Sequence, residues 1–97
     1  MQRKTNQESL GEVIERMLKV YRLKSGLTEI ALKSDWEKIV GSVIASRTDD
    51  ILLRGNKLIL KINSAAMKQE LHYQREGIMA NVNKHLEQDL IREVLIQ

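Results

Sequence analysis

Two histidines are the residues in this 97-residue chain best suited to metal or acid–base chemistry. His72 precedes Glu76 by four positions and His85 precedes Asp89 by four, so each pair would share one face of a helix. A catalytic zinc ion normally takes three protein ligands, and each pair supplies two. No strand–turn–helix segment presents a serine nucleophile. We therefore expect no catalytic residues, no metal and no cofactor, and predict that the protein is not an enzyme.

Basic residues form the second group with functional potential. The chain has 16 Lys and Arg against 13 Asp and Glu, a net charge of +3 that permits a polyanionic partner without requiring one. Five basic residues fall in or just after a predicted β-hairpin: Arg54, Lys57, Lys61, Lys68 and Arg75. They could neutralise nucleic-acid phosphates, each contact adding to a salt-dependent affinity. Equally, they could protect an exposed hairpin from edge-to-edge association.

The composition indicates one small domain with an aliphatic core. Hydrophobic residues make up 42% of the chain, but aromatic residues only 3%, and Phe is absent. Cysteine is absent too, which rules out disulfides and thiolate metal sites. No apolar run approaches the roughly 20 residues of a membrane span. We predict a cytoplasmic protein with a flexible arm at residues 1–8 and a single domain at residues 9–97.

Residues 49–63 predict a β-hairpin. Gly55-Asn56 is a two-residue loop with Gly first, typical of a type II′ turn with positive φ at Gly55. This turn pairs Arg54 with Lys57 and sets the register of both strands. Alternation along the strands then places five apolar residues on the core side: Ile51, Leu53, Leu58, Leu60 and Ile62.

The opposite side of the hairpin mixes charged and apolar residues: Asp50, Leu52, Arg54, Lys57, Ile59 and Lys61. Leu52 and Ile59 should be neighbours across the two strands and form a candidate protein-interaction patch. Single exposed apolar residues are common, so the patch gains weight only if Val94 or Ile96 of a last strand extends it.

Helices are expected on both sides of the hairpin. Ser9 and Glu12 form a capping box before residues with helical apolar spacing, and Ser25-Gly26 should end this first helix. The apolar residues with this spacing are Leu10, Val13, Ile14, Met17, Leu18 and Tyr21.

Ser34 and Glu37 form a second possible capping box, so we expect another helix from about residue 35 to residue 46. Trp36 lies on an apolar stripe of this helix and should be a core anchor. Gly41 would lie inside it.

After the hairpin, Ser64 should cap one helix that runs to Leu86 with Gly77 inside it. The final LIREVLIQ has the alternation of a strand, which could lie parallel to the second hairpin strand. The elements together predict an α+β domain of order ααββαβ, with a three-stranded sheet and helices packed on one face.

Four segments carry a resemblance to a known family. They are W36-E-K-I-V-G41, A45-S-R47-T48, R54-G-N-K-L58 and N63-S-A-A-M-K-Q-E-L71. In this combination and order the chain resembles the DciA-like family of bacterial proteins, from about Leu10 to Ile96. The resemblance implies a KH-like module, although the GxxG loop of true KH domains is missing from this sequence.

The resemblance also implies a function in replication initiation, with DNA and the replicative DNA helicase as partners and no enzymatic activity. The hairpin cations are then the candidate nucleic-acid contacts. Two alternatives stay open: an RNA-binding module, and a protein-interaction or dimerisation domain that binds no nucleic acid.

Overall fold

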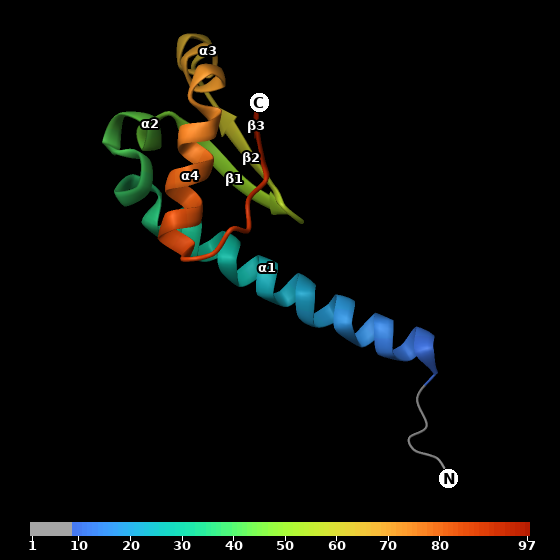
Figure 1. The fold of residues 1–97 in the computed structure, drawn as a ribbon. Helices are drawn as coiled ribbons and strands as arrows, with labels where there is room; N and C mark the ends of the chain where they lie inside the picture. The colour runs from blue at the N-terminus through green and yellow to red at the C-terminus, as the bar shows by residue number, and fades with distance from the viewer. Residues whose placement is uncertain (1–8) are drawn as a thin grey trace.

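The computed structural model describes residues 9–97, so the predicted arm at residues 1–8 lies outside the described residues. The elements follow in the order α1 (Leu10–Val40), α2 (Ser42–Ser46), β1 (Thr48–Arg54), β2 (Lys57–Ile62), α3 (Ala65–Tyr73), α4 (Arg75–Leu86) and β3 (Glu93–Ile96). Strand β2 lies between its neighbours, antiparallel to β1 and parallel to β3. The α+β class and the three-stranded sheet are thus confirmed, with the helices gathered on one side of the sheet (Figure 1).

The hairpin has the predicted register. Arg54 pairs with Lys57, and the pairing continues without a shift to Asp50 and Lys61. Gly55 has φ of 64°, whereas Asn56 does not have a positive φ, which matches a type II′ turn. The five residues predicted to face the core are all buried: Ile51, Leu53, Leu58, Leu60 and Ile62.

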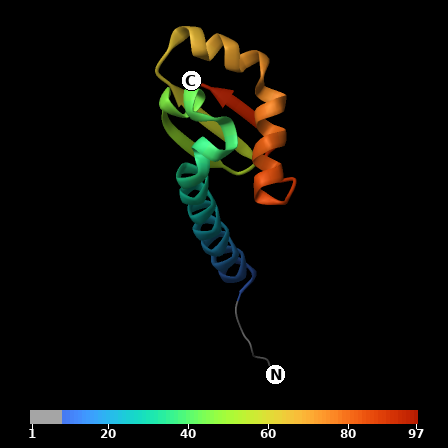
Figure 2. The same ribbon diagram turned by 90° about the vertical axis from the view of Figure 1, so that its left-hand side faces the viewer.

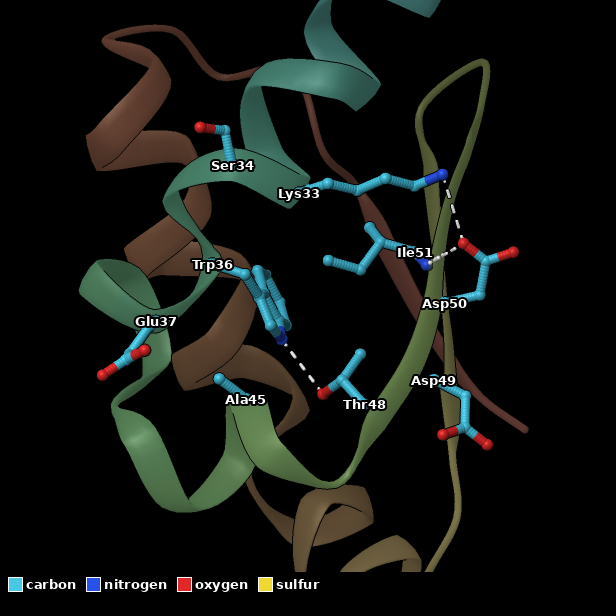
Figure 3. Close-up of a pocket in the computed structure, with 9 residues that line it drawn as sticks. All are labelled: Lys33, Ser34, Trp36, Glu37, Ala45, Thr48, Asp49, Asp50 and Ile51. Atoms are coloured by element: carbon cyan, nitrogen blue, oxygen red, sulfur yellow. Dashed lines mark hydrogen bonds and ion pairs between the residues drawn. The ribbon is translucent and has the colours of Figure 1, made fainter.

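Trp36 is the core anchor that its stripe predicts. Only 4% of the residue is exposed, and its indole N–H donates to Oγ1 of Thr48 at 3.0 Å (Figure 3). The Thr48 hydroxyl in turn donates to the carbonyl of Ile44 at 2.8 Å. One aromatic side chain therefore ties together the end of α1, the short helix α2 and the start of β1.

Two predicted features of the first 46 residues are wrong. Helix α1 does not end at Gly26 and does not begin again at Ser34, but runs unbroken for 31 residues. It ends instead at Gly41, whose φ of 94° and ψ of 164° lie in a region that essentially only glycine adopts. The helix continues through Gly26 because the apolar residues before and after it lie on the same side of one helix. A single glycine destabilises a helix by only about 1 kcal/mol relative to alanine.

The segment after the hairpin is two helices where one was expected. Ser64 caps α3 as predicted, its hydroxyl accepting from the Met67 N–H at 3.2 Å. The helix then stops at Gln74, and α4 runs in a new direction (Figure 2). The bend lets Leu71 of α3 and Ile78 of α4 both reach the core, at 0% and 4% exposure. The order is therefore ααββααβ.

Helix α1 extends well beyond the body of the domain. At 1.5 Å per residue its length is about 46 Å, and its N-terminal half projects away from the sheet (Figures 1 and 2). No helix among residues 9–97 combines the length and apolar character needed to cross a membrane.

Candidate nucleic-acid interface

Arg54 and Lys57 flank the hairpin turn, but Arg54 is already engaged. Its Nη1 donates to Oε2 of Glu29 at 3.2 Å and to the carbonyl of Leu53 at 3.0 Å. The same Glu29 oxygen accepts the backbone N–H of Leu53 at 2.7 Å. Arg54 therefore fastens β1 to α1, while 62% of its side chain stays exposed.

Lys57 is held more loosely. Its Nζ lies 4.0 Å from Oε1 of Glu93 on the neighbouring strand, and the two side chains are 54% and 50% exposed. Ion pairs this exposed contribute at most about 1 kcal/mol and are screened by salt. A phosphate could compete with Glu93 for Lys57 at little cost.

Arg92 is a third cation near the turn, and no motif in the sequence predicted it there. Its backbone N–H donates to the carbonyl of Asn56 at 2.8 Å, which brings it beside the turn. Its side chain is 65% exposed and pairs with Asp89 at 3.3 Å. Only the predicted parallel pairing of the last strand with β2 could have indicated this position. In a parallel pair the two strands start at the same edge of the sheet, so the residue before β3 lies near the start of β2.

Lys61 lies on the same sheet face at the far end of β2, four residues or about 13 Å from Lys57. It faces Asp50, whose pKa is lowered chiefly by the Ile51 N–H and then by Lys33, with Lys61 adding a smaller effect. The Lys61 side chain is exposed and forms no ion pair with any residue between 9 and 97.

Lys68 and Arg75, expected on one helix, lie on two. Lys68 is exposed on α3 and Arg75 is the first residue of α4. Arg75 and Arg92 share the lining of a groove of about 310 Å³ at the free edge of β3. The other residues lining this groove are Glu76, Met79, Glu93, Val94 and Leu95. The five predicted cations are thus spread over the hairpin turn, the far end of β2 and the helices.

The apolar patch on the outer sheet face is larger than predicted. Leu52 pairs with Ile59, and Ile59 pairs with Leu95, so three half-buried side chains form one row across the sheet. The third member is Leu95, not Val94 or Ile96. Val94 points the other way and is 5% exposed in the core. We call Leu52, Ile59 and Leu95 the apolar row.

A comparison with protein families identifies the chain. The family model described as Dna[CI] antecedent, DciA, matches residues 9–96. This chain belongs to the DciA family. The family is associated with bacterial DNA replication and helicase loading, is linked to the replicative helicase, and is not a known enzyme family. No curated protein matches the chain.

A second hollow in this DciA-family domain is a poor phosphate site. It has a volume of about 400 Å³ and lies where the end of α1 meets α2 and β1 (Figure 3). Glu37, Asp49 and Asp50 line it against the single cation Lys33, which is held by Asp50 at 3.2 Å. The lining therefore has a net negative charge and would repel a polyanion.

The histidines have structural explanations in this domain. His85 Nε2 lies 2.9 Å from Oδ2 of Asp35, a contact that joins α4 to α1. The break at Gln74 separates His72 on α3 from Glu76 on α4, so the expected one-helix pair does not form. Within residues 9–97 no three His, Cys, Asp or Glu side chains are grouped so that they could hold a metal ion.

Proposed function

We propose that this DciA-family chain binds DNA through the outer face of its sheet and contacts the replicative helicase during replication initiation. The observation that carries the proposal is the family match over residues 9–96, nearly the whole chain. The cytoplasm is the location that this role requires. The outer face of the sheet, which carries no helix (Figure 1), supports the assignment of DNA as a ligand. Lys57 and Lys61 alternate with the buried Leu58 and Leu60 along β2, so they point to this outer face.

The cations differ in how freely they could contact phosphate. Lys57 and Arg92 hold their carboxylate partners in exposed, weak ion pairs, and Lys61 holds none within the described residues. Arg54 would have to loosen the Glu29 contact that anchors β1. We therefore assign the main phosphate contacts to Lys57 and Lys61 on the outer face, and a further one to Arg92 at the edge of the sheet, in the groove beside β3. Arg54, Lys68 and Arg75 would contribute at the periphery.

The test is a salt titration of single-stranded and duplex DNA binding by the Lys57→Ala/Lys61→Ala double variant. Each lost phosphate contact should reduce the slope of log K against log salt by about 0.7 for single strands and about 0.9 for duplexes. Thermal stability should change little, because both side chains are exposed.

The matched control is Lys38→Ala/Lys84→Ala, which removes the same charge from exposed positions on the helical side of the sheet. It should leave the salt slope unchanged. Equal binding by the parent and the sheet-face variant would contradict the assignment. Tighter, salt-dependent binding of single-stranded RNA than of DNA would replace DNA with RNA as the ligand.

The apolar row supports a second assignment, a contact with the helicase. Three aligned aliphatic side chains on a face without helices are unusual for a surface that meets only water or phosphate. Ile59→Glu should weaken capture of the purified helicase, whereas Val43→Glu, on an exposed residue of α2, should not. Unchanged helicase capture by a folded Ile59→Glu variant would remove the row from this role.

A further inference from the structure

A hollow of about 450 Å³ lies between α1 and the hairpin turn, beside the contacts assigned to the outer face of the sheet. Its volume is within the roughly 300–1,000 Å³ that is typical of sites for small ligands. The lining includes Tyr21, Arg22 and Gly26 from α1, and Arg54 and Gly55 from the hairpin. An aromatic ring, two guanidinium groups and two glycines therefore surround one open space.

Tyr21 provides an aromatic wall for this hollow. Its side chain reaches from α1 to the turn, because an added Cβ at Gly55 would lie 3.8 Å from the Tyr21 hydroxyl. The residue is nevertheless 48% exposed, so part of it is open to a ligand. Aromatic side chains in such positions stack on nucleobases, and the stacking tolerates any sequence because every base has a π face.

Gly26 keeps the hollow open. It lies inside α1, where glycine is less favourable than every residue except proline. An added Cβ at Gly26 would meet no atom within 4 Å, so it would project into open space beside the hollow. A larger side chain at this position would occupy room that a ligand could take.

The lining of the hollow has a net positive charge. Its cations are Arg22 and Arg54, and its one carboxylate is Glu29. Glu29 is already compensated, because its Oε2 lies 3.2 Å from Nη1 of Arg54 and its Oε1 lies 3.8 Å from Nζ of Lys33. Arg22 is exposed and forms no ion pair with any residue between 9 and 97. The hollow therefore suits a ligand that is both aromatic and anionic.

We propose that this hollow binds one nucleotide of single-stranded DNA, with the base stacked on Tyr21 and the adjacent phosphate on Arg22. The site rests on the DNA binding proposed above and adds to it a preference for single strands. Arg54 can flank the base with the plane of its guanidinium group while Glu29 holds it in place. Because Arg54 pairs with Lys57 across the turn, a strand bound at Lys57 leads directly to the hollow.

The preference for single strands follows from stacking. In a duplex the neighbouring bases cover both faces of each base, so a base must leave the stack before it can contact a protein ring. An unpaired base is already free to do so. We therefore expect Tyr21 to contribute to the binding of single-stranded DNA and not to the binding of duplex DNA.

The test compares one DNA oligonucleotide as a single strand and as a duplex. Tyr21→Ala should weaken single-strand binding by about fivefold to a hundredfold and leave duplex binding unchanged. Tyr21→Phe should bind single strands like the parent, because the ring and not the hydroxyl stacks on the base. The matched control is Tyr73→Ala, which removes the chain's other tyrosine, 81% exposed on α3, and should change neither affinity.

Gly26→Leu is a second variant, which fills the hollow and leaves Tyr21 in place. Leucine favours a helix more than glycine does, so the fold should be kept while single-strand binding falls about as far as in Tyr21→Ala. Gly77→Leu is its matched control, because Gly77 also lies in a helix and an added Cβ there meets nothing within 4 Å.

The outcomes separate this site from the DNA binding on which it rests. Parent-like binding of single strands by Tyr21→Ala or Gly26→Leu would overturn the site alone, as would an equal loss of single-strand and duplex binding. A parent that binds duplex DNA and no single strands would also overturn it and leave the outer face as the DNA-binding surface. A parent that binds neither form would overturn both proposals.

Discussion

The two halves of α1 have the same amphipathic pattern and opposite surroundings. Leu32 and Trp36 in the C-terminal half are buried against the sheet, whereas Ile14 and Leu18, five turns earlier on the same side, are about half exposed. Periodicity therefore reports which side of a helix is to be buried, and it does not report what buries it. In this chain the sheet buries one half, and nothing among residues 9–97 buries the other.

Truncating matched residues in the two halves should give the largest contrast. Trp36→Ala should cost about 3–5 kcal/mol, because it leaves a cavity in the core and also removes the hydrogen bond to Thr48. Leu18→Ala should cost no more than about 0.5 kcal/mol in dilute, monomeric protein. Chemical denaturation measures both. A fluorescence spectrum typical of water-exposed Trp in the folded parent would contradict the placement of Trp36.

The end of the buried half should be the next most sensitive position. Gly41→Ala forces a side chain into a backbone conformation that only glycine adopts readily, although no atom lies within 4 Å of the added Cβ. We expect a loss of about 1–3 kcal/mol in the free energy of unfolding. Because the strain is in the backbone, Gly41→Asn should be less destabilising than Gly41→Val. Equal stability of Gly41→Ala and the parent would show that the helix does not end in this way.

Glycine to alanine at the junction of the two halves should increase stability, whereas at Gly41 it should decrease it. Gly26 lies inside α1 without a positive φ, and an added Cβ would meet nothing within 4 Å. Gly26→Ala should therefore stabilise the helix by about 0.5–1 kcal/mol. Slower amide exchange in residues 10–25 would be the sensitive measurement. Faster exchange there would mean that the helix bends or ends at Gly26, as the sequence alone suggested.

The hairpin was predictable from its turn as far as Asp50 and Lys61, and the helices only in part, for a physical reason. Gly55-Asn56 sets a two-residue turn, and the cross-strand pairs from Arg54–Lys57 to Asp50–Lys61 follow from that turn by counting. Only beyond Asp50 does an irregularity shift the register, so that Thr48 pairs with Ile62. Helix ends have no such local determinant. Ser25-Gly26 and Ser34 have the residue types of a stop and a start, but the apolar stripe in phase across them outweighs both signals.

The residues of the candidate site were also predictable only in part. Lys57 and Lys61 could be assigned to the outer face from the hairpin alone. Arg92 and Leu95 could not, because their positions depend on how β3 aligns with β2, a contact between segments more than 30 residues apart. Arg75 was expected on the same helix as Lys68 but lies on the next one, because the bend at Gln74 brings Leu71 and Ile78 into the core and follows no local sequence preference.

The smallest expected effect concerns the exposed start of α1. The backbone N–H of Ser9 donates to Glu12, and the Ser9 hydroxyl accepts from the Glu12 N–H, each at 3.2 Å. The Ser9 backbone N–H first, then the Ser9 side chain and the charge of Arg16 stabilise the Glu12 carboxylate and lower the pKa of Glu12 below its usual 4.5. A lowered pKa in the folded state means that the stabilisation is present above pH 4.5 and is lost as the pH falls through the folded-state value.

Amide exchange in the first turn should therefore accelerate as the pH falls below about 4.5, relative to the rate expected for an unstructured chain. Glu12→Gln keeps a hydrogen-bonding side chain without the titrating charge, so its protection should not change over the same range. Residues 32–40, packed on the sheet, provide the internal reference, because losing this cap does not remove their contacts. If both halves lost protection together, the exposed half of α1 would be as strongly coupled to the core as the buried half, and the distinction between them would fail.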